Sequence, residues 1–123
     1  MIGRVENLHA LVPVTFRLPG RPDISIEFVV DTGFTGELTL PPAAIAALGL
    51  PFAYNENVVL ATDAHEEVPM HLAIIVWDGD ERVARVLAAG SRPLLGTALL
   101  AGSELVAQFL QGGLVTIDSI LPV

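Results

Sequence analysis

One acidic residue of this chain, Asp31, directly follows an apolar stretch and opens a turn punctuated by glycines. The run reads Phe28-Val29-Val30-Asp31-Thr32-Gly33-Phe34-Thr35-Gly36. A carboxylate at the end of a buried strand is costly to remove from water unless it is hydrogen-bonded, paired or protonated. Because carboxyl groups in such settings serve as general acids and bases, Asp31 is the first candidate catalytic residue.

Other groups that could do chemistry carry weaker signals. His71 and the run His65-Glu66-Glu67 could suggest a metal site, but zinc sites generally need three protein ligands and this spacing does not clearly bring three together. The acidic run from Asp78 to Glu81 lacks the further ligands of a calcium loop. We therefore interpret the first group as a solvated hairpin and the second as an exposed turn, expect no metal and no cofactor, and assign His9 to a surface or edge.

The residues before Asp31 predict a hairpin that delivers it. Val12 to Leu18 is rich in β-branched and aromatic residues, and Pro19 to Asp23 has the composition of a turn. From Ile24 to Val30 apolar and polar residues alternate until just before Asp31, which is typical of a half-buried strand. Asp31 is therefore expected at the end of a strand.

The residues after the turn predict further short strands and two short helices. The expected elements are a strand at Glu37 to Leu40, a helix at Ala43 to Leu48 that ends at Gly49, strands at Asn57 to Thr62 and Val68 to Trp77 around a polar tip at Asp63 to Glu67, a strand at Arg82 to Ala88, a helix through Ala98 to Leu100 or beyond, strands at Val106 to Leu110 and Leu114 to Ile117, and an apolar tail at Ile120 to Val123. No linker or repeat interrupts them, which predicts one mostly β domain over residues 1–123.

The run from Phe28 to Gly36, followed much later by Leu94-Leu95-Gly96, resembles the retropepsin-like aspartic proteases, which are single-domain relatives of retroviral protease and pepsin. A bare Asp-Thr-Gly triplet recurs by chance, so the extended run and the later segment carry the resemblance. The order of elements also matches over nearly the whole chain, most closely the small bacterial and archaeal type. The resemblance implies a pepsin/retropepsin-like closed β-barrel half with one or two short helices, assembled as a homodimer.

Roles for individual residues follow from this resemblance. It implies catalytic roles for Asp31, Thr32 and Gly33: the carboxylate, a hydrogen bond across the dimer axis, and a backbone N–H that approaches the carboxylate. Leu94, Leu95 and Gly96 would support the motif from beneath. The expected substrate contacts are Thr35 in the loop and Thr62, Asp63, Ala64 and His65 in the flap hairpin.

Two departures from the retroviral pattern bear on these substrate contacts. Retroviral enzymes carry an acidic residue two positions after the glycine of the motif, whereas this chain has Thr35. Retroviral flaps also carry glycines at the tip, and the stretch from Asp63 to Glu67 has none. Contacts with the substrate backbone and flap closure are therefore expected to differ from those of the viral enzymes.

Composition restricts the partners and the location. Six arginines and no lysine face fourteen acidic residues, giving a net charge of -8 that argues against binding a nucleic-acid backbone. The longest apolar run, Leu72 to Trp77, is too short to span a membrane, and the N-terminus shows no signal peptide, so we expect no membrane partner and a cytoplasmic location. Hydrophobic residues make up 52% of the chain, which leaves apolar surface for a partner.

Two functions are compatible with these observations. The first is an aspartic endopeptidase that hydrolyses peptide bonds with a water activated between two Asp31 carboxylates of a homodimer. The alternative is a non-catalytic or weakly active peptide-binding or assembly module on the same dimeric fold. Both take a peptide or protein as substrate or ligand, and both need the homodimer, because one chain supplies one copy of the motif.

Overall fold

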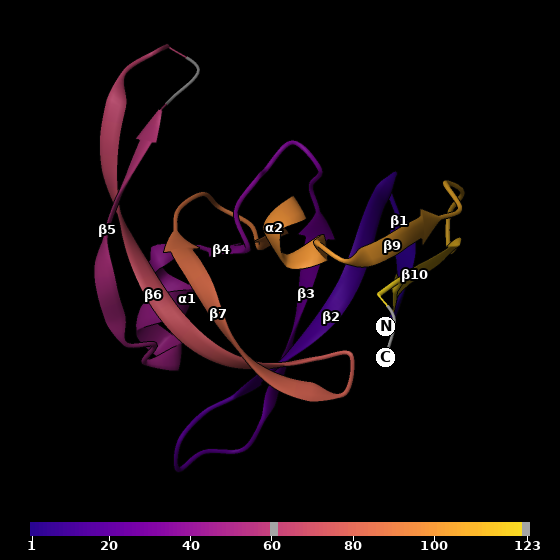
Figure 1. Ribbon diagram of the computed structural model, residues 1–123, viewed down its shortest axis with the longest axis horizontal. Helices are drawn as coiled ribbons and strands as arrows, with labels where there is room; N and C mark the ends of the chain where they lie inside the picture. The colour runs from indigo at the N-terminus through magenta and orange to yellow at the C-terminus, as the bar shows by residue number, and fades with distance from the viewer. Residues whose placement is uncertain (60–61, 122–123) are drawn as a thin grey trace.

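A computed structural model describes residues 1–59 and 62–121 and confirms a mostly β chain (Figure 1). The elements in these residues are β1 (Ile2–Glu6), β2 (His9–Arg17), β3 (Ile24–Val30), β4 (Leu38–Leu40), α1 (Pro42–Leu48), β5 (Phe52–Val59), β6 (His65–Trp77), β7 (Asp80–Ala88), β8 (Leu94–Leu95), α2 (Thr97–Leu100), β9 (Ser103–Ala107) and β10 (Leu114–Ser119). The helices are short, so strand pairing organises the molecule.

All ten of these strands belong to one sheet. Its order is β5-β6-β7-β4-β8-β3-β2-β1-β10-β9, and β6 also pairs with β2. This additional antiparallel pairing runs from Thr15 opposite Val76 to Arg17 opposite Ile74, so hydrogen-bonded neighbours form a circuit through β2, β3, β8, β4, β7 and β6. The strand pairing establishes this circuit. The closed barrel expected from the sequence stays a prediction.

The core is formed by buried residues of these strands together with residues of β1, β10 and both helices, and it follows the alternation of the strands. In β2 the buried residues are Ala10, Val12, Val14 and Phe16, with less buried residues between them. The rings of Phe16 and Phe28 stack with centroids 5.9 Å apart and an interplanar angle of 6°. Full burial of an aromatic side chain of this size contributes about 1.5–3 kcal/mol, so this pair fixes β2 against β3 just before Asp31.

Helix α1 ends where its sequence predicts and begins one residue before the predicted Ala43, at Pro42. Pro42 occupies the first turn, where a missing N–H costs nothing, and Gly49 ends the helix with a φ of 66° in the left-handed region. The Arg21 guanidinium donates a hydrogen bond to the Leu48 carbonyl at 2.7 Å, which satisfies one of the free carbonyls at the helix end.

The β5–β6 hairpin is longer than its sequence suggests. We expected a polar tip from Asp63 to Glu67, but β6 already begins at His65 and runs to Trp77. Cross-strand pairing extends from Phe52 opposite His71 to Val59 opposite His65, and these backbone hydrogen bonds form in spite of the polar side chains. Leu60 and Ala61, at the end of the predicted strand Asn57 to Thr62, lie outside the described residues.

The two ends of the chain depart most from the expected elements. The sequence reading missed β1, which pairs with β2 and β10. The strand predicted at Val106 to Leu110 was misplaced, because β9 spans Ser103–Ala107 and the chain turns away after Ala107. Both errors involve strands whose position depends on pairing with the distant β10. Of the expected tail, Pro122 and Val123 lie outside the described residues.

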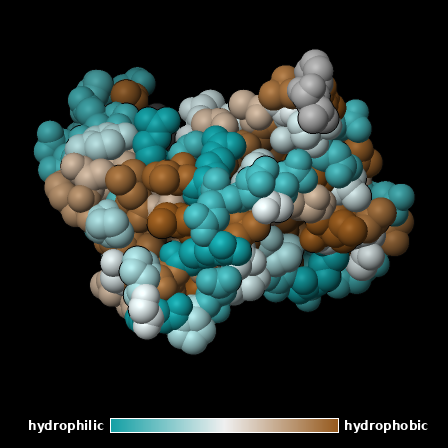
Figure 2. All heavy atoms as spheres, turned by 60° about the horizontal axis from the view of Figure 1, so that its bottom comes forward, coloured by the Kyte–Doolittle hydropathy of each residue, from teal (hydrophilic) through white to brown (hydrophobic). Residues whose placement is uncertain are grey.

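Apolar side chains also occupy part of the surface. Figure 2 shows apolar patches set among hydrophilic side chains on the face turned forward there. Large hydrophobic residues with more than half of their surface exposed are Ile2, Leu8, Phe52, Val59, Val83, Phe109, Leu110, Ile120 and Leu121. Within residues 1–59 and 62–121, no helix is both long and apolar enough to cross a membrane.

Candidate active site

Asp31 follows the last residue of β3 and is held there by its backbone. Its N–H donates to the Leu95 carbonyl at 2.9 Å, and its own carbonyl accepts from the N–H of Phe34 at 3.1 Å. The first bond continues the parallel pairing between β3 and β8, in which Val30 lies opposite Leu95. The position of Asp31 is therefore set by β8, a strand much later in the sequence.

The Asp31 carboxylate turns back over its own loop. Its Oδ1 accepts a hydrogen bond from the N–H of Gly33 at 2.9 Å, and a Cβ on Gly33 would lie 3.2 Å from the same oxygen. Within the described part of the chain, no cationic group lies within 4.0 Å of this half-buried carboxylate. The carboxylate is oriented by the backbone and stays available to a water or a second acid. Thr32, beside it, is exposed.

The Leu94-Leu95-Gly96 segment lies between two strands, β3 and β4. Leu94 and Leu95 pair in parallel with β3 and antiparallel with β4, and Leu95 is fully buried. The Leu94 N–H donates to the hydroxyl of buried Thr39 at 3.2 Å. This segment forms the support on which the Asp31 loop lies.

The turn from Phe34 to Gly36 packs directly on Gly96. The N–H of Thr97 donates to the Phe34 carbonyl at 2.9 Å, and that of Ala98 donates to the Gly36 carbonyl at 3.1 Å. A Cβ on Gly96 would lie 2.6 Å from both the ring and the carbonyl oxygen of Phe34. Close backbone approach therefore requires glycine at position 96.

Two hollows adjoin the Asp31 loop. The first, about 420 Å³, is lined by Leu8, His9, Ala10, Val29, Val30, Asp31, Thr32, Arg92, Leu94 and Phe109. The second, about 470 Å³, is lined by the stretch from Gly33 to Leu38, by Tyr54, Glu56, Asn57, Val58, Val59 and Met70 of the hairpin, and by Arg85, Leu87 and Ala98. The loop thus separates a hollow that contains the carboxylate from a groove beneath the hairpin.

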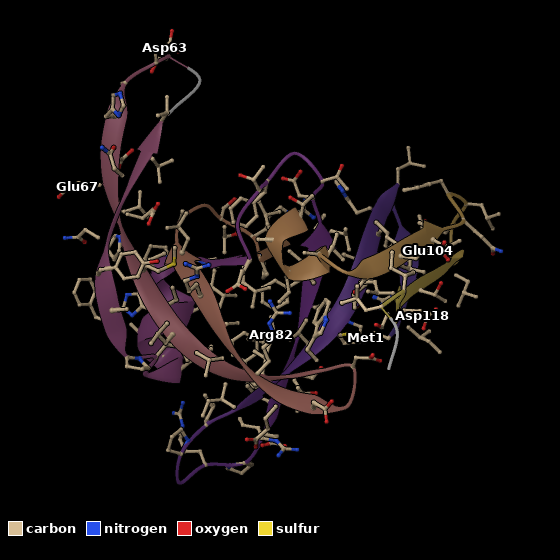
Figure 3. All side chains as sticks on the ribbon, viewed as in Figure 1. Met1, Asp63, Glu67, Arg82, Glu104 and Asp118 are labelled. Atoms are coloured by element: carbon tan, nitrogen blue, oxygen red, sulfur yellow. The ribbon has the colours of Figure 1, made fainter. Side chains whose placement is uncertain are left out.

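The expected substrate contacts divide between this groove and the hairpin end. Thr35 lines the groove, whereas Thr62, Asp63, Ala64 and His65 are exposed and line neither hollow. Figure 3 shows Asp63 at the far end of the hairpin and Glu67 farther along β6, both directed away from the centre of the molecule. The strands of the hairpin, rather than its end, border the groove.

A buried carboxylate, Glu37, joins the loop to β7. It accepts from the N–H of Arg85 at 2.8 Å and from Nη2 of Arg82 at 3.0 Å, and its side chain is only 10% exposed. Figure 3 shows Arg82 near the middle of the molecule. The Tyr54 phenol, through a hydrogen bond, and the charge of Glu37 raise the pKa of Arg85 above its ordinary value. This network fixes the wall of the groove.

The histidines and acidic residues considered for metal binding do not converge. His71 Nδ1 lies 3.0 Å from the Leu50 carbonyl, and His65 Nδ1 lies 3.3 Å from the Asn57 side-chain oxygen. In residues 1–59 and 62–121, no group of three or more His, Asp or Glu side chains could hold a metal ion.

Two residues near Asp31 were missed by the sequence reading. We assigned His9 to a surface or edge and named no role for Arg92. In the structure Arg92 Nη1 lies 3.4 Å from His9 Nε2, and both border the hollow that contains Asp31. The one available signal was the place of Arg92 just before the Leu94-Leu95-Gly96 segment, because residues 83 positions apart give no local pattern.

Comparisons with known proteins support the fold. No protein-family profile matches the sequence, and no curated protein does. Among solved structures, the EIAV protease in complex with an inhibitor is similar, at 19% identity with a TM-score of 0.58, over 83% of this chain and 98% of that one. A retropepsin-like aspartic protease from Rickettsia conorii matches at 16% identity with a TM-score of 0.58, over 98% of this chain and 95% of that one. The chain therefore has the retropepsin-like fold.

Proposed function

We propose that this protein is an aspartic endopeptidase whose active site forms between two copies of the chain. The observation that carries the proposal is the geometry of Asp31: it follows the end of a strand, its carboxylate is oriented by the Gly33 N–H at 2.9 Å, and the residue lines a hollow of about 420 Å³. The retropepsin-like fold supports the same conclusion. An oriented carboxylate beside open space can hold a water for attack on a carbonyl.

The chemistry requires a second carboxylate. In this reaction class two carboxyl groups share one proton: the ionised one removes a proton from the water as it attacks, and the protonated one hydrogen-bonds to the carbonyl oxygen and then supplies a proton to the leaving amine. The proposed partner of Asp31 is Asp31 of a second chain across a twofold axis, because the sequence holds one Asp-Thr-Gly element. Thr32, which is exposed beside Asp31, would make the contact across that axis.

The surface around Asp31 suits such an interface. Leu8 and Phe109 line the hollow with Asp31, and they are 74% and 63% exposed. Large apolar side chains at a polar site lose contact with water when a partner covers them, which favours association. We expect the second copy to lie over these residues, and the substrate to extend from this hollow into the groove beneath the hairpin.

Substitution of Asp31 by Asn tests the proposal. The Asp31→Asn protein keeps the shape of the side chain but cannot ionise, so cleavage of a broad peptide library should fall by roughly 10²- to 10⁴-fold or more. Circular dichroism and sedimentation should show an unchanged fold and dimer. Cleavage at the normal rate by this variant would refute the assignment.

The hairpin favours a second candidate function, a peptide-binding or assembly module without significant hydrolysis. Its end carries no glycine, and Thr35 replaces the acidic residue of the retroviral pattern. This candidate predicts that a peptide binds the wild-type protein and stays intact through prolonged incubation from acidic to neutral pH. Complete conversion of that peptide to products, followed by mass spectrometry, would exclude it.

A further inference from the structure

We propose that Arg92, positioned by His9, makes the hollow beside Asp31 a subsite that selects an acidic side chain next to the scissile bond. This inference rests on the proposed function, because it names the substrate class of that site. The chain as a whole is acidic, with a net charge of -8, whereas this hollow is lined by the positively charged Arg92. A cationic group here therefore creates a local preference that the overall charge opposes.

Among the arginines, Arg92 is distinguished because no residue of the described part of the chain pairs with its charge. Arg4, Arg17, Arg82 and Arg85 each pair with at least one carboxylate, and Arg21 donates to the carbonyls at the end of α1. No carboxylate or carbonyl of residues 1–59 and 62–121 pairs with Arg92. Its charge is thus available to a group that enters the hollow.

The His9 ring holds the guanidinium without using up its donors. Arg92 Nη1 lies 3.4 Å from His9 Nε2, which accepts a hydrogen bond when the ring proton is on Nδ1. A guanidinium has five N–H donors in a planar fork, so one bond to the ring leaves enough donors to bind both oxygens of a carboxylate. His9 is therefore a positioning residue for Arg92.

The walls of the hollow suit the remainder of such a side chain. Ala10, Val29 and Leu94 line the same hollow as Arg92 and Asp31 and contribute apolar surface to it. The methylene groups of a glutamate can pack against this surface while the carboxylate reaches Arg92 at the rim. A glutamine fits the same space but lacks the charge, so the Glu/Gln pair isolates the contribution of Arg92.

The test measures binding and cleavage separately. An Asp31→Asn background prevents turnover, and its affinity is measured for extended hydrophobic peptides in which each position in turn carries Glu or Gln. We expect about threefold to tenfold tighter binding of Glu at one position. That preference should disappear on adding Arg92→Gln and return in part with Arg92→Lys. Arg21→Gln, which removes an arginine that contacts the C-terminal end of α1 and lines neither hollow at the Asp31 loop, should leave the preference unchanged.

Several results would overturn the subsite. Equal binding of every Glu and Gln pair would do so, and so would the absence of any peptide binding. If Arg92→Gln weakened all peptides equally and lowered the dimer fraction in sedimentation, Arg92 would pair with the second copy instead. Wild-type cleavage separates the two proposals: cleavage without a Glu preference refutes only the subsite, whereas a binding preference without cleavage refutes only the endopeptidase.

Discussion

Gly96 packs against Gly36 so closely that a Cβ on Gly96 would clash with the Gly36 carbonyl oxygen. The backbone hydrogen bonds on either side, from Gly96 N–H to the Glu37 carbonyl at 2.8 Å and from Ala98 N–H to the Gly36 carbonyl at 3.1 Å, prevent the two segments from separating. The contact joins the Asp31 loop to the start of α2. It couples the loop geometry to a segment about half the chain away.

Replacement of Gly96 by Ala should therefore destabilise the protein and distort the loop. Gly96 has a φ of -102°, so the backbone tolerates Ala and the cost comes from the clash with Phe34 and Gly36. We expect the free energy of unfolding in urea to fall by about 1–3 kcal/mol, a typical cost of overpacking. Peptide cleavage should fall by more than the unfolded fraction explains, because the loop carries Asp31.

Gly20→Asn is the matched control for this variant. Gly20 has a φ of +70° in an exposed turn, and nothing lies within 4 Å of a Cβ there. Asn tolerates this left-handed conformation better than most residues do. Its unfolding and activity should stay close to wild type, and an equal loss in both variants would argue against a specific role for the Gly96 contact.

Replacement of Glu37 by Gln should weaken the link between the loop and β7. Gln can still accept the Arg85 N–H, but it loses the charge that pairs with Arg82 at 3.0 Å. Because the Glu37 side chain is only 10% exposed, we expect the free energy of unfolding to fall by about 1–3 kcal/mol. Chemical denaturation at constant pH and salt measures it.

Glu27→Gln provides the comparison for Glu37→Gln. Glu27 also pairs with an arginine, Arg4, but both side chains are nearly half exposed. Exposed ion pairs contribute little, so the unfolding midpoint should not shift measurably. If the two variants were equally stable, the contacts of the largely buried Glu37 carboxylate would stabilise the fold no more than an exposed pair does.

The sequence predicts those parts of the fold that local patterns determine. The alternation before Asp31 defines β3, and Pro42 and Gly49 mark the ends of α1 through backbone preferences that act within one turn. By contrast, β1 and β9 are short, and their bounds depend on register with β10, which no local pattern encodes. The same reason explains the hairpin, where pairing with β5 incorporates His65 into β6.

The candidate site likewise has residues that a local pattern reveals and residues that only distant strand pairing brings together. Asp31 is recognisable because a carboxylate interrupts an apolar pattern, and its contacts to Gly33 lie within the motif. His9 and Arg92 meet only because the ends of β2 and β8 lie on either side of β3. The residues of the groove, such as Tyr54 and Arg85, also come from different strands, so only the folded chain reveals them.

Phe109→Thr should weaken dimer formation without destabilising the chain. Phe109 is 63% exposed and lines the hollow with Asp31, so in the proposed dimer its ring would be covered by the second copy. Loss of that burial should raise the dissociation constant of the dimer. A loss of about 1.4 kcal/mol of binding free energy would raise it roughly tenfold. Sedimentation velocity over a dilution series measures the change.

Val83→Thr tests whether that effect is local. Val83 is 62% exposed on β7 and lines neither hollow at the Asp31 loop. The substitution removes a similarly exposed apolar side chain and keeps a β-branched residue in the strand. Its dimer dissociation constant should match wild type, and a change equal to that of Phe109→Thr would place the interface elsewhere.

Mixing subunits tests directly whether one active site needs two Asp31 carboxylates. Wild-type protein and Asp31→Asn protein, mixed at constant total concentration and allowed to exchange, should form heterodimers that lack one of the two acids. If both carboxylates are essential, activity falls with the square of the wild-type fraction, because only wild-type homodimers cleave. A site complete within one chain gives a linear decrease instead, and a mixture prepared without time for exchange supplies the same linear reference.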